Sequence, residues 1–155
     1  MAQESTVLVT GGSGFAGTYL VEFLRTRPDL IVWTCDRTGP SPQLGPAAAA
    51  RHIKIDLLNP TDARQMLAEV RPDYVYHLAG QVSFDPRDPA AMYDLHVQCT
   101  RVLLEECRAA GVRRFILASS SGTIGISREE KLHTEEDEYP LPVVARWPYY
   151  LSKIF

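Results

Sequence analysis

Short runs of apolar and β-branched residues alternate along the chain with longer segments in which apolar residues recur every three or four positions. The short runs are typical of buried strands, and the longer segments are typical of helices that cover one face of a sheet. Strands are predicted at 6–10, 31–35, 52–55, 74–78 and 114–118. A strand–helix alternation requires parallel strands joined by right-handed crossovers, so the predicted fold class is α/β with a doubly wound parallel sheet.

The remaining segments are predicted from helical periodicity and from turn residues. Helices are predicted at 14–25, 60–70, 89–110 and from about Pro148 to Phe155. Asn59 is a candidate N-cap for the second helix, and Gly111 is a candidate C-cap for the third. The Pro- and Gly-rich segment 38–50 is predicted to be a loop, and residues 119–147 are predicted to be irregular.

Length and composition predict one globular domain over residues 1–155, with 45% hydrophobic and 23% charged residues. The net charge is −3 and no Lys/Arg cluster or membrane-length apolar run is present, so neither nucleic acid nor a membrane is expected as a partner. The start of the chain lacks signal-peptide features, which predicts a cytoplasmic location. The 3 cysteines and 4 histidines lack ligand spacing, so no metal site is expected.

The segment TGGSGFAG at 10–17 joins the first predicted strand to the first predicted helix. Gly11, Gly14 and Gly17 fit a G-x-x-G-x-x-G pattern, and Gly12 takes the place of Gly11 in the related G-x-G-x-x-G reading. Glycines permit a tight turn whose backbone approaches a pyrophosphate, and the free N–H groups at a helix start favour its negative charge. This context predicts a Rossmann-type nucleotide-cofactor site.

Asp36 closes the second predicted strand and follows Gly17 by 19 residues. A carboxylate at this position accepts hydrogen bonds from the adenosine ribose hydroxyls, which favours NAD. Arg37 comes next and is able instead to pair with a 2′-phosphate, so NADP stays open as the alternative cofactor.

Four segments together resemble the extended short-chain dehydrogenase/reductase family, in particular its NAD-dependent epimerase/dehydratase members. They are TGGSGFAG at 10–17, DLLNP at 56–60, YHLAGQ at 76–81, and ASSSGTIG at 118–125 with PYYLSK at 148–153. The resemblance places Asp56 and Leu57 beside the adenine ring and implies further contacts along the cofactor. Together with Asp36 and Arg37, the implied cofactor residues are Gly11, Gly14, Phe15, Ala16, Gly17, Asp56, Leu57, Leu78, Ala79, Gly80, Tyr149 and Lys153.

The same resemblance implies a catalytic Ser or Thr after the fifth strand and a Tyr-x-x-x-Lys on the next helix. Tyr149 lies four residues before Lys153, whereas Tyr150 does not, so Tyr149 and Lys153 share one helix face. The implied hydroxyl is Ser120, with Ser121 as the alternative, and it would bind the substrate oxygen. A nearby ammonium stabilises a phenolate, so Tyr149 would exchange a proton with a substrate hydroxyl while hydride leaves or joins the same carbon. Lys153 would also hold the nicotinamide ribose.

Two features depart from the family pattern. His96 stands where family members usually carry Asn. The chain ends at Phe155, within the predicted Tyr-x-x-x-Lys helix, whereas extended family members are considerably longer. The resemblance therefore implies the N-terminal half of such an enzyme, without the substrate domain. It also implies a homodimer that pairs through the long helix, where Val97 and Leu104 lie off the apolar stripe.

The implied function is NAD(P)-dependent hydride transfer at a sugar carbon, with a nucleotide sugar as the small-molecule substrate of an epimerase or dehydratase. One alternative is a ketone or aldehyde reductase similar to dihydroflavonol reductases, whose serine loop the SSSGTIG segment also resembles. A second alternative is a cofactor-binding regulator without catalysis. The presence of Ser120, Tyr149 and Lys153 argues against the regulator, because a sensor needs no Tyr-Lys pair.

Overall fold

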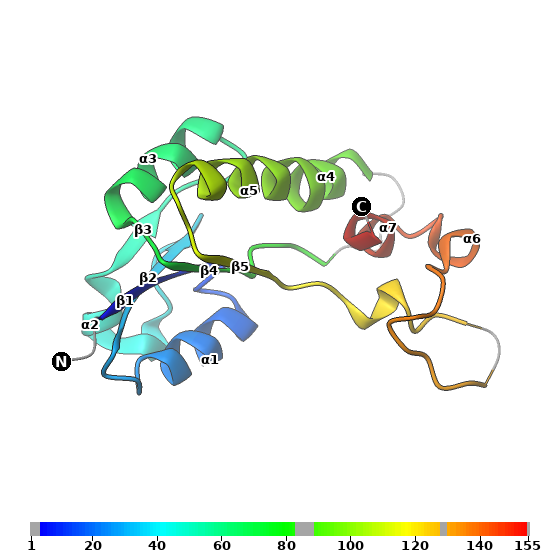
Figure 1. The fold of residues 1–155 in the computed structure, drawn as a ribbon, viewed down its shortest axis with the longest axis horizontal. Helices are drawn as coiled ribbons and strands as arrows, with labels where there is room; N and C mark the ends of the chain where they lie inside the picture. Colours follow the sequence, from blue (N-terminus) through cyan, green and yellow to red (C-terminus); the bar gives the residue numbers. More distant parts are fainter. Residues whose placement is uncertain (1–3, 83–88, 128–129, 155) are drawn as a thin grey trace. The chain divides into compact units, whose positions relative to one another are not determined.

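A computed structural model describes residues 4–82, 89–127 and 130–154 of the chain. Within them, five strands form one sheet in the order β3-β2-β1-β4-β5 (Figure 1). The strands are β1 (Ser5–Thr10), β2 (Leu30–Asp36), β3 (His52–Lys54), β4 (Tyr74–His77) and β5 (Arg114–Leu117). Neighbouring strands pair in parallel throughout, so the predicted doubly wound α/β fold is confirmed.

The helical segments follow the predicted order. They are α1 (Phe15–Leu24), η1 (Pro42–Leu44), α2 (Gly45–Ala49), α3 (Pro60–Val70), α4 (Pro89–Tyr93), η2 (Asp94–Gln98), α5 (Cys99–Ala109), η3 (Ser121–Thr123), α6 (Leu141–Val144) and α7 (Pro148–Ile154). The segments η1 and η3 are 3₁₀ turns, whereas η2 is a π-helical turn between α4 and α5. The predicted helix at 89–110 is therefore interrupted. Phe155, at the end of the predicted last helix, lies outside the described residues.

The prediction of a loop at 38–50 is wrong in part, because η1 and α2 lie within it. Pro46 occupies the start of α2, where its missing N–H has no helical partner to lose, and alanines with high helix propensity follow. Leu44 and Ala48 are buried against the sheet, and this burial favours helix in a segment rich in turn residues. The region 119–147 likewise contains η3 and α6.

Local signals placed the ends of two helices correctly. The side chain of Asn59 accepts a hydrogen bond from the N–H of Thr61 at 3.0 Å, which caps α3 as predicted. Gly111 has a φ of 78°, and the next N–H, that of Val112, donates to the carbonyl of Cys107 at 3.0 Å. A left-handed glycine with this hydrogen bond is a common way to end a helix, here α5.

The chain divides into two compact units, Met1–Gly80 with Cys99–Ala118, and Gln81–Gln98 with Ser119–Phe155. The first unit contains the sheet. Leu8 and Met66 belong to the core between the sheet and α3 and α5, whereas Val7 and Val21 belong to the core on the side of α1 and α2 (Figure 1). Helices thus cover both faces, as a doubly wound sheet requires.

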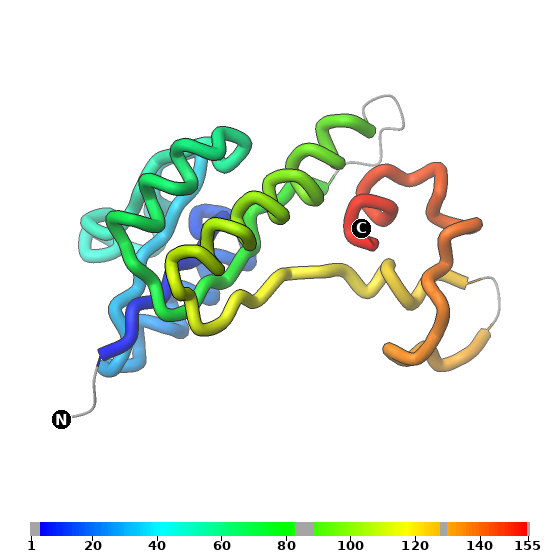
Figure 2. The backbone as a smooth tube through the Cα atoms, turned by 45° about the horizontal axis from the view of Figure 1, so that its top comes forward, coloured from blue at the N-terminus to red at the C-terminus, as the bar shows by residue number. Residues whose placement is uncertain are grey.

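The second unit holds α4, η2, α6 and α7. The helix α7 packs against both α4 and η2 within this unit (Figure 2). Val144 of α6 is fully buried. In the described part of the chain, no helix is long and apolar enough to cross a membrane, and no group of three or more His, Cys, Asp or Glu side chains is placed to hold a metal ion.

The Asn59 cap gives a direct test of the fold. Asn59→Ala removes the acceptor for the N–H of Thr61 and should lower the free energy of unfolding by about 1 kcal/mol. Urea denaturation followed by circular dichroism measures the change. Asn59→Ser keeps a side-chain acceptor and should retain most of the stability. Equal stability of the Ala and Ser variants would show that the cap contributes nothing.

Candidate functional site

The turn between β1 and α1 brings backbone segments closer together than side chains would allow. Gly11 has a φ of +70°, and a Cβ built on it would lie 2.7 Å from the backbone nitrogen of Ala79. A Cβ on Gly17 would overlap the carbonyl oxygen of Gly11 and lie 2.8 Å from the Cα of Gly12. Both positions therefore require glycine, the first for its conformation and both for space.

The other two glycines of the turn differ from each other. A Cβ on Gly12 would lie 2.7 Å from the Cβ of Thr34 on β2, so this position also lacks room for a side chain. A Cβ on Gly14 would meet only the Gly11 oxygen, at 3.3 Å. Gly12 thus has a stronger steric requirement than Gly14, although the sequence pattern pointed to Gly14 in both of its readings.

The start of α1 offers unsatisfied donors beside this turn. Gly14 is the N-cap and supplies no side-chain hydrogen bond. The first helical bond runs from the N–H of Thr18 to the carbonyl of Gly14 at 2.9 Å, so the N–H groups of Phe15, Ala16 and Gly17 form the open first turn. Phe15 and Ala16 are exposed. Such a helix end, with its positive dipole, is suited to bind an anionic group.

Asp36 lies next to the same turn. One carboxylate oxygen accepts from the N–H of Ser13 at 3.3 Å, and the other accepts from the N–H of Thr38 at 3.3 Å. The structure therefore brings Asp36, at the end of β2, together with the glycine turn as its predicted role demands. Arg37 is exposed.

Thr10 ties the end of β4 to the turn. Its carbonyl accepts from the N–H of Leu78 at 3.2 Å, and its hydroxyl accepts from the N–H of Ala79 at 3.2 Å. The same hydroxyl lies 2.7 Å from Nδ1 of buried His77, whose Nε2 lies 3.1 Å from the hydroxyl of Thr100 on α5. This network fixes Leu78 and Ala79 beside Gly11, and exposed Gly80 follows them. Sequence reasoning did not single out His77, although a histidine within an apolar strand was a visible signal.

Asp56 and Leu57 follow β3. The carboxylate of Asp56 accepts from the N–H of Leu58 at 3.0 Å, and Asp56 is exposed. The side chain of Leu57 packs in the core that includes α3 and α5 and is 7% exposed. Only Asp56 of this pair thus presents its side chain to solvent.

In the second unit, α7 carries Tyr149 and Lys153, and its two tyrosines have different surroundings. The ring of Tyr150 packs on Gly122, where any Cβ would overlap it. The ring of Tyr149 lies edge-on to His96, with centroids 5.7 Å apart. Burial lowers the pKa of the Lys153 ammonium. Tyr149 and Lys153 thus share a partly buried environment near His96, whereas Tyr150 has a packing role.

Ser120 begins the 3₁₀ turn η3. Its hydroxyl oxygen accepts from the N–H of Gly122 at 3.2 Å and so caps the turn. This bond uses a lone pair and not the hydroxyl proton. The alternative, Ser121, is exposed and sits inside the turn, where its carbonyl accepts from the N–H of Gly125 at 2.7 Å.

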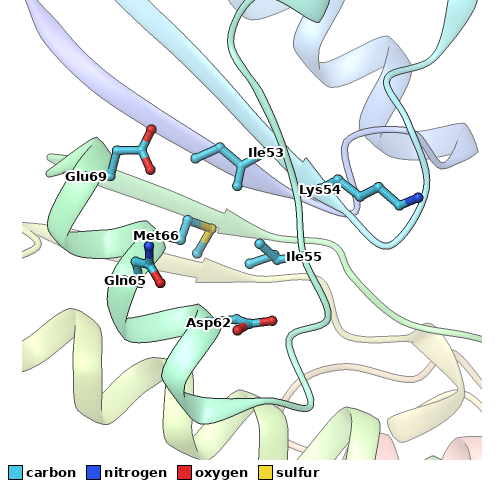
Figure 3. A pocket seen from close by; sticks show the side chains of 7 residues that line it. All are labelled: Ile53, Lys54, Ile55, Asp62, Gln65, Met66 and Glu69. Carbon is cyan, nitrogen blue, oxygen red and sulfur yellow. The ribbon is translucent and has the colours of Figure 1, made fainter.

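A separate pocket lies between the β3 segment and α3 (Figure 3). Asp62 and Glu69 of α3 line it, and the side chain of Lys54 extends away from these acidic groups (Figure 3). It contains none of the residues predicted for cofactor binding or catalysis, so it is not part of the candidate site.

Comparison with known proteins adds to this geometry. The profile of the NAD dependent epimerase/dehydratase family matches residues 7–155. Sterol demethylase protein B of Methylococcus capsulatus is 35% identical over 122 residues, which cover 79% of this chain and 36% of that protein. UDP-glucose 4-epimerase of Mycolicibacterium smegmatis is 32% identical over 153 residues, which cover 95% of this chain and 47% of that protein.

The solved structures include a UDP-glucose 4-epimerase of Thermus thermophilus in complex with NAD. It is 29% identical with a TM-score of 0.79, and the match covers 96% of this chain and 47% of that one. The chain thus spans about half or less of the length of the proteins it matches.

Gly17 provides a test of the close approach in the turn. Gly17→Ala places a Cβ against the backbone of Gly11 and should lower the free energy of unfolding by about 1–3 kcal/mol. Alanine normally stabilises a helix relative to glycine, so a loss isolates the steric clash. Gly39→Ala is the control, because a Cβ there meets nothing within 4 Å. Equal thermal and urea stability of the two variants would contradict the steric requirement.

Proposed function

Because the chain belongs to the NAD-dependent epimerase/dehydratase family, we propose that it binds NAD and serves hydride transfer at a sugar carbon of a nucleotide sugar. The observation that carries this proposal is the open helix start of α1, which follows a turn with no room for a side chain at Gly11, Gly12 or Gly17. Backbone donors and close approach are what a pyrophosphate group requires.

The residues present fit the cofactor. The N–H groups of Phe15, Ala16 and Gly17 would hold the pyrophosphate, and Asp36 would accept from the adenosine ribose hydroxyls. Since the side chain of Leu57 is buried, that residue would contact the adenine region through its backbone. The remaining proposed cofactor contacts are Gly11, Gly14, Arg37, Asp56, Leu78, Ala79, Gly80, Tyr149 and Lys153.

Ser120, Tyr149 and Lys153 are the proposed catalytic residues. NAD, when bound, supplies a hydride acceptor and, in its reduced form, a hydride donor. Tyr149 would take a proton from a substrate hydroxyl and later return it, while the Ser120 hydroxyl would donate a hydrogen bond to the substrate oxygen and keep its proton. The Lys153 ammonium would favour the phenolate of Tyr149, and its partial burial strengthens that electrostatic effect.

A second candidate substrate is a sterol alcohol, favoured by the similarity to sterol demethylase protein B and to a sterol-4-alpha-carboxylate 3-dehydrogenase of Saccharomyces cerevisiae. The two candidates differ in their cofactor balance. Epimerisation consumes and regenerates NAD, so UDP-galactose should form from UDP-glucose without net absorbance change at the NADH band. Oxidation of a sterol alcohol should instead accumulate NADH.

We also propose that the protein forms a homodimer through its long helix. Leu104 of α5 supports this proposal, because it is an apolar side chain that is 43% exposed.

Cofactor choice gives a binding test. The Asp36 carboxylate should repel a 2′-phosphate, so calorimetry should show tighter binding of NAD than of NADP. Asp36→Asn keeps the shape but removes the charge, and it should narrow the preference by about tenfold, or ~1.4 kcal/mol. The contact proposed for Arg37 is with the 2′-phosphate of NADP, so Arg37→Ala should leave the affinity for NAD unchanged and serves as the matched control. A preference for NADP that disappears in Arg37→Ala would reverse the assignment of these two residues.

The assignment of the acid/base residue is tested by the two tyrosines of α7. Tyr149→Phe removes the proposed proton-transfer group and should lower kcat with the nucleotide sugar by at least about two orders of magnitude. Tyr150→Phe keeps the ring that packs on Gly122 and should change kcat little. The opposite ranking of the two variants would assign the chemistry to Tyr150.

A further inference from the structure

His96, on the π-turn η2, is buried and makes a hydrogen bond with each ring nitrogen. Nε2 accepts from the backbone N–H of Gln81 at 3.1 Å. Nδ1 lies 2.8 Å from the hydroxyl oxygen of Ser152 on α7, and that hydroxyl donates to the carbonyl of Tyr149 at 2.7 Å. The exposed fractions of His96 and Ser152 are both 6%. The imidazole thus bridges two segments that are far apart in the sequence, both within the second unit.

The partners of His96 determine its tautomer. A backbone N–H is only a donor, so Nε2 must be the unprotonated acceptor. The proton of the neutral ring is then on Nδ1 and is donated to Ser152, whose own proton goes to the Tyr149 carbonyl. A protonated ring would direct an N–H at the N–H of Gln81 and lose that bond. The chain of bonds therefore has one direction and needs a neutral imidazole.

Ser152 lies between Tyr149 and Lys153 in α7, so a bond to Ser152 fixes the turn that carries both side chains. Resting on the function proposed above, we propose that neutral His96 is a positioning residue that sets the orientation of Tyr149 and Lys153 through its Nδ1–H bond to Ser152. His96 lies on the π-turn, and single π-turns within helices are frequent at functional sites.

The surroundings of His96 favour its neutral form. Burial lowers the pKa of His96 to about 4, and the positive charge of Lys153 contributes as the smaller cause. Tyr149 of α7 faces the ring edge-on. Among the described elements, α4 also packs against η2, and its sequence PAAMY contains no charged side chain. The chain of hydrogen bonds from Gln81 through His96 and Ser152 to Tyr149, here called the relay, is therefore intact at neutral pH.

Asn and Gln each reproduce half of the imidazole. In Asn the amide nitrogen is as many bonds from Cβ as Nδ1 is in His, so His96→Asn retains a donor for Ser152. Gln places its amide farther out, near the position of Nε2, so His96→Gln retains an acceptor for Gln81 but loses the donor for Ser152. Comparison of the two variants therefore separates the effect of the bond to Ser152, which positions α7, from that of the bond to Gln81.

Two-dimensional ¹H–¹⁵N NMR of the imidazole nitrogens tests the relay without substrate or cofactor. His96 should show the Nδ1–H tautomer, and its chemical shifts should stay constant from about pH 8 down to about pH 5, whereas an unperturbed histidine has a pKa of about 6.5. The His96→Asn variant assigns the signal. Titration of His96 near that ordinary value, or an Nε2–H tautomer, overturns the proposal.

Turnover of the nucleotide sugar tests the positioning role. Ser152→Ala and His96→Gln should each lower kcat by roughly tenfold or more at nearly unchanged KM, because the acid/base residue is misplaced while binding contacts remain. His96→Asn should retain more of kcat than His96→Gln. The double variant of His96→Gln with Ser152→Ala should be no worse than either single variant, since both break one relay.

Additive losses in the double variant, or a His96→Gln turnover equal to that of His96→Asn, overturn the positioning role. Failure of the wild-type protein to bind NAD in calorimetry overturns the proposed function, and the positioning role falls with it. The NMR result stands apart from that failure, because it reports the protonation and partners of His96 alone.

Discussion

The close approach of the β1–α1 turn to its surroundings is the constraint on which the first unit depends. The Gly11 carbonyl faces the first turn of α1, and the Gly11 backbone faces the residues after β4, with no space for a Cβ at Gly11 or Gly17. The N–H of Gly11 also donates to the carbonyl of Cys35 at 2.9 Å, which joins the turn to β2. The ends of β1, β2 and β4 are thereby brought to one place, with Asp36 and Ala79 beside the open donors of α1.

Features whose cause is local were predictable from the sequence. The glycine turn, the Asn59 cap and the Gly111 helix end each depend on residues within a few positions of one another, and all three have the expected geometry. The wrong part of the prediction, the loop at 38–50, reflects a competition between turn residues and the burial of Leu44 and Ala48. Burial of Ala48 against the sheet decides it, and the local pattern does not contain that information.

Features whose cause lies far away in the sequence were not predictable. The hydrogen-bond partners of His96 are Gln81 and Ser152, which lie 15 and 56 positions away in the sequence. The partners of His77 are Thr10 and Thr100, which lie 67 and 23 positions away. No periodicity marks such a residue, because histidine is neither typically buried nor typically exposed. The π-turn at 94–98 was not predicted either. It contains His96, whose hydrogen-bond partners lie outside the turn. The relative burial of Asp56 and Leu57 also depends on packing against α3 and α5.

The two units meet the demands of their proposed chemistry by different means. Binding of a pyrophosphate is assigned to backbone N–H groups, which depend on the path of the chain and tolerate many side chains. Proton transfer is assigned to side chains whose orientation requires support from other side chains, and here that support is an imidazole. An amide in place of His96 would not titrate, whereas an imidazole accepts from the N–H of Gln81 only while it is neutral. Two causes keep the imidazole neutral: burial lowers the pKa of His96 to about 4, and the positive charge of Lys153 contributes to the same shift. A second charge beside the ammonium that the chemistry requires is thereby disfavoured.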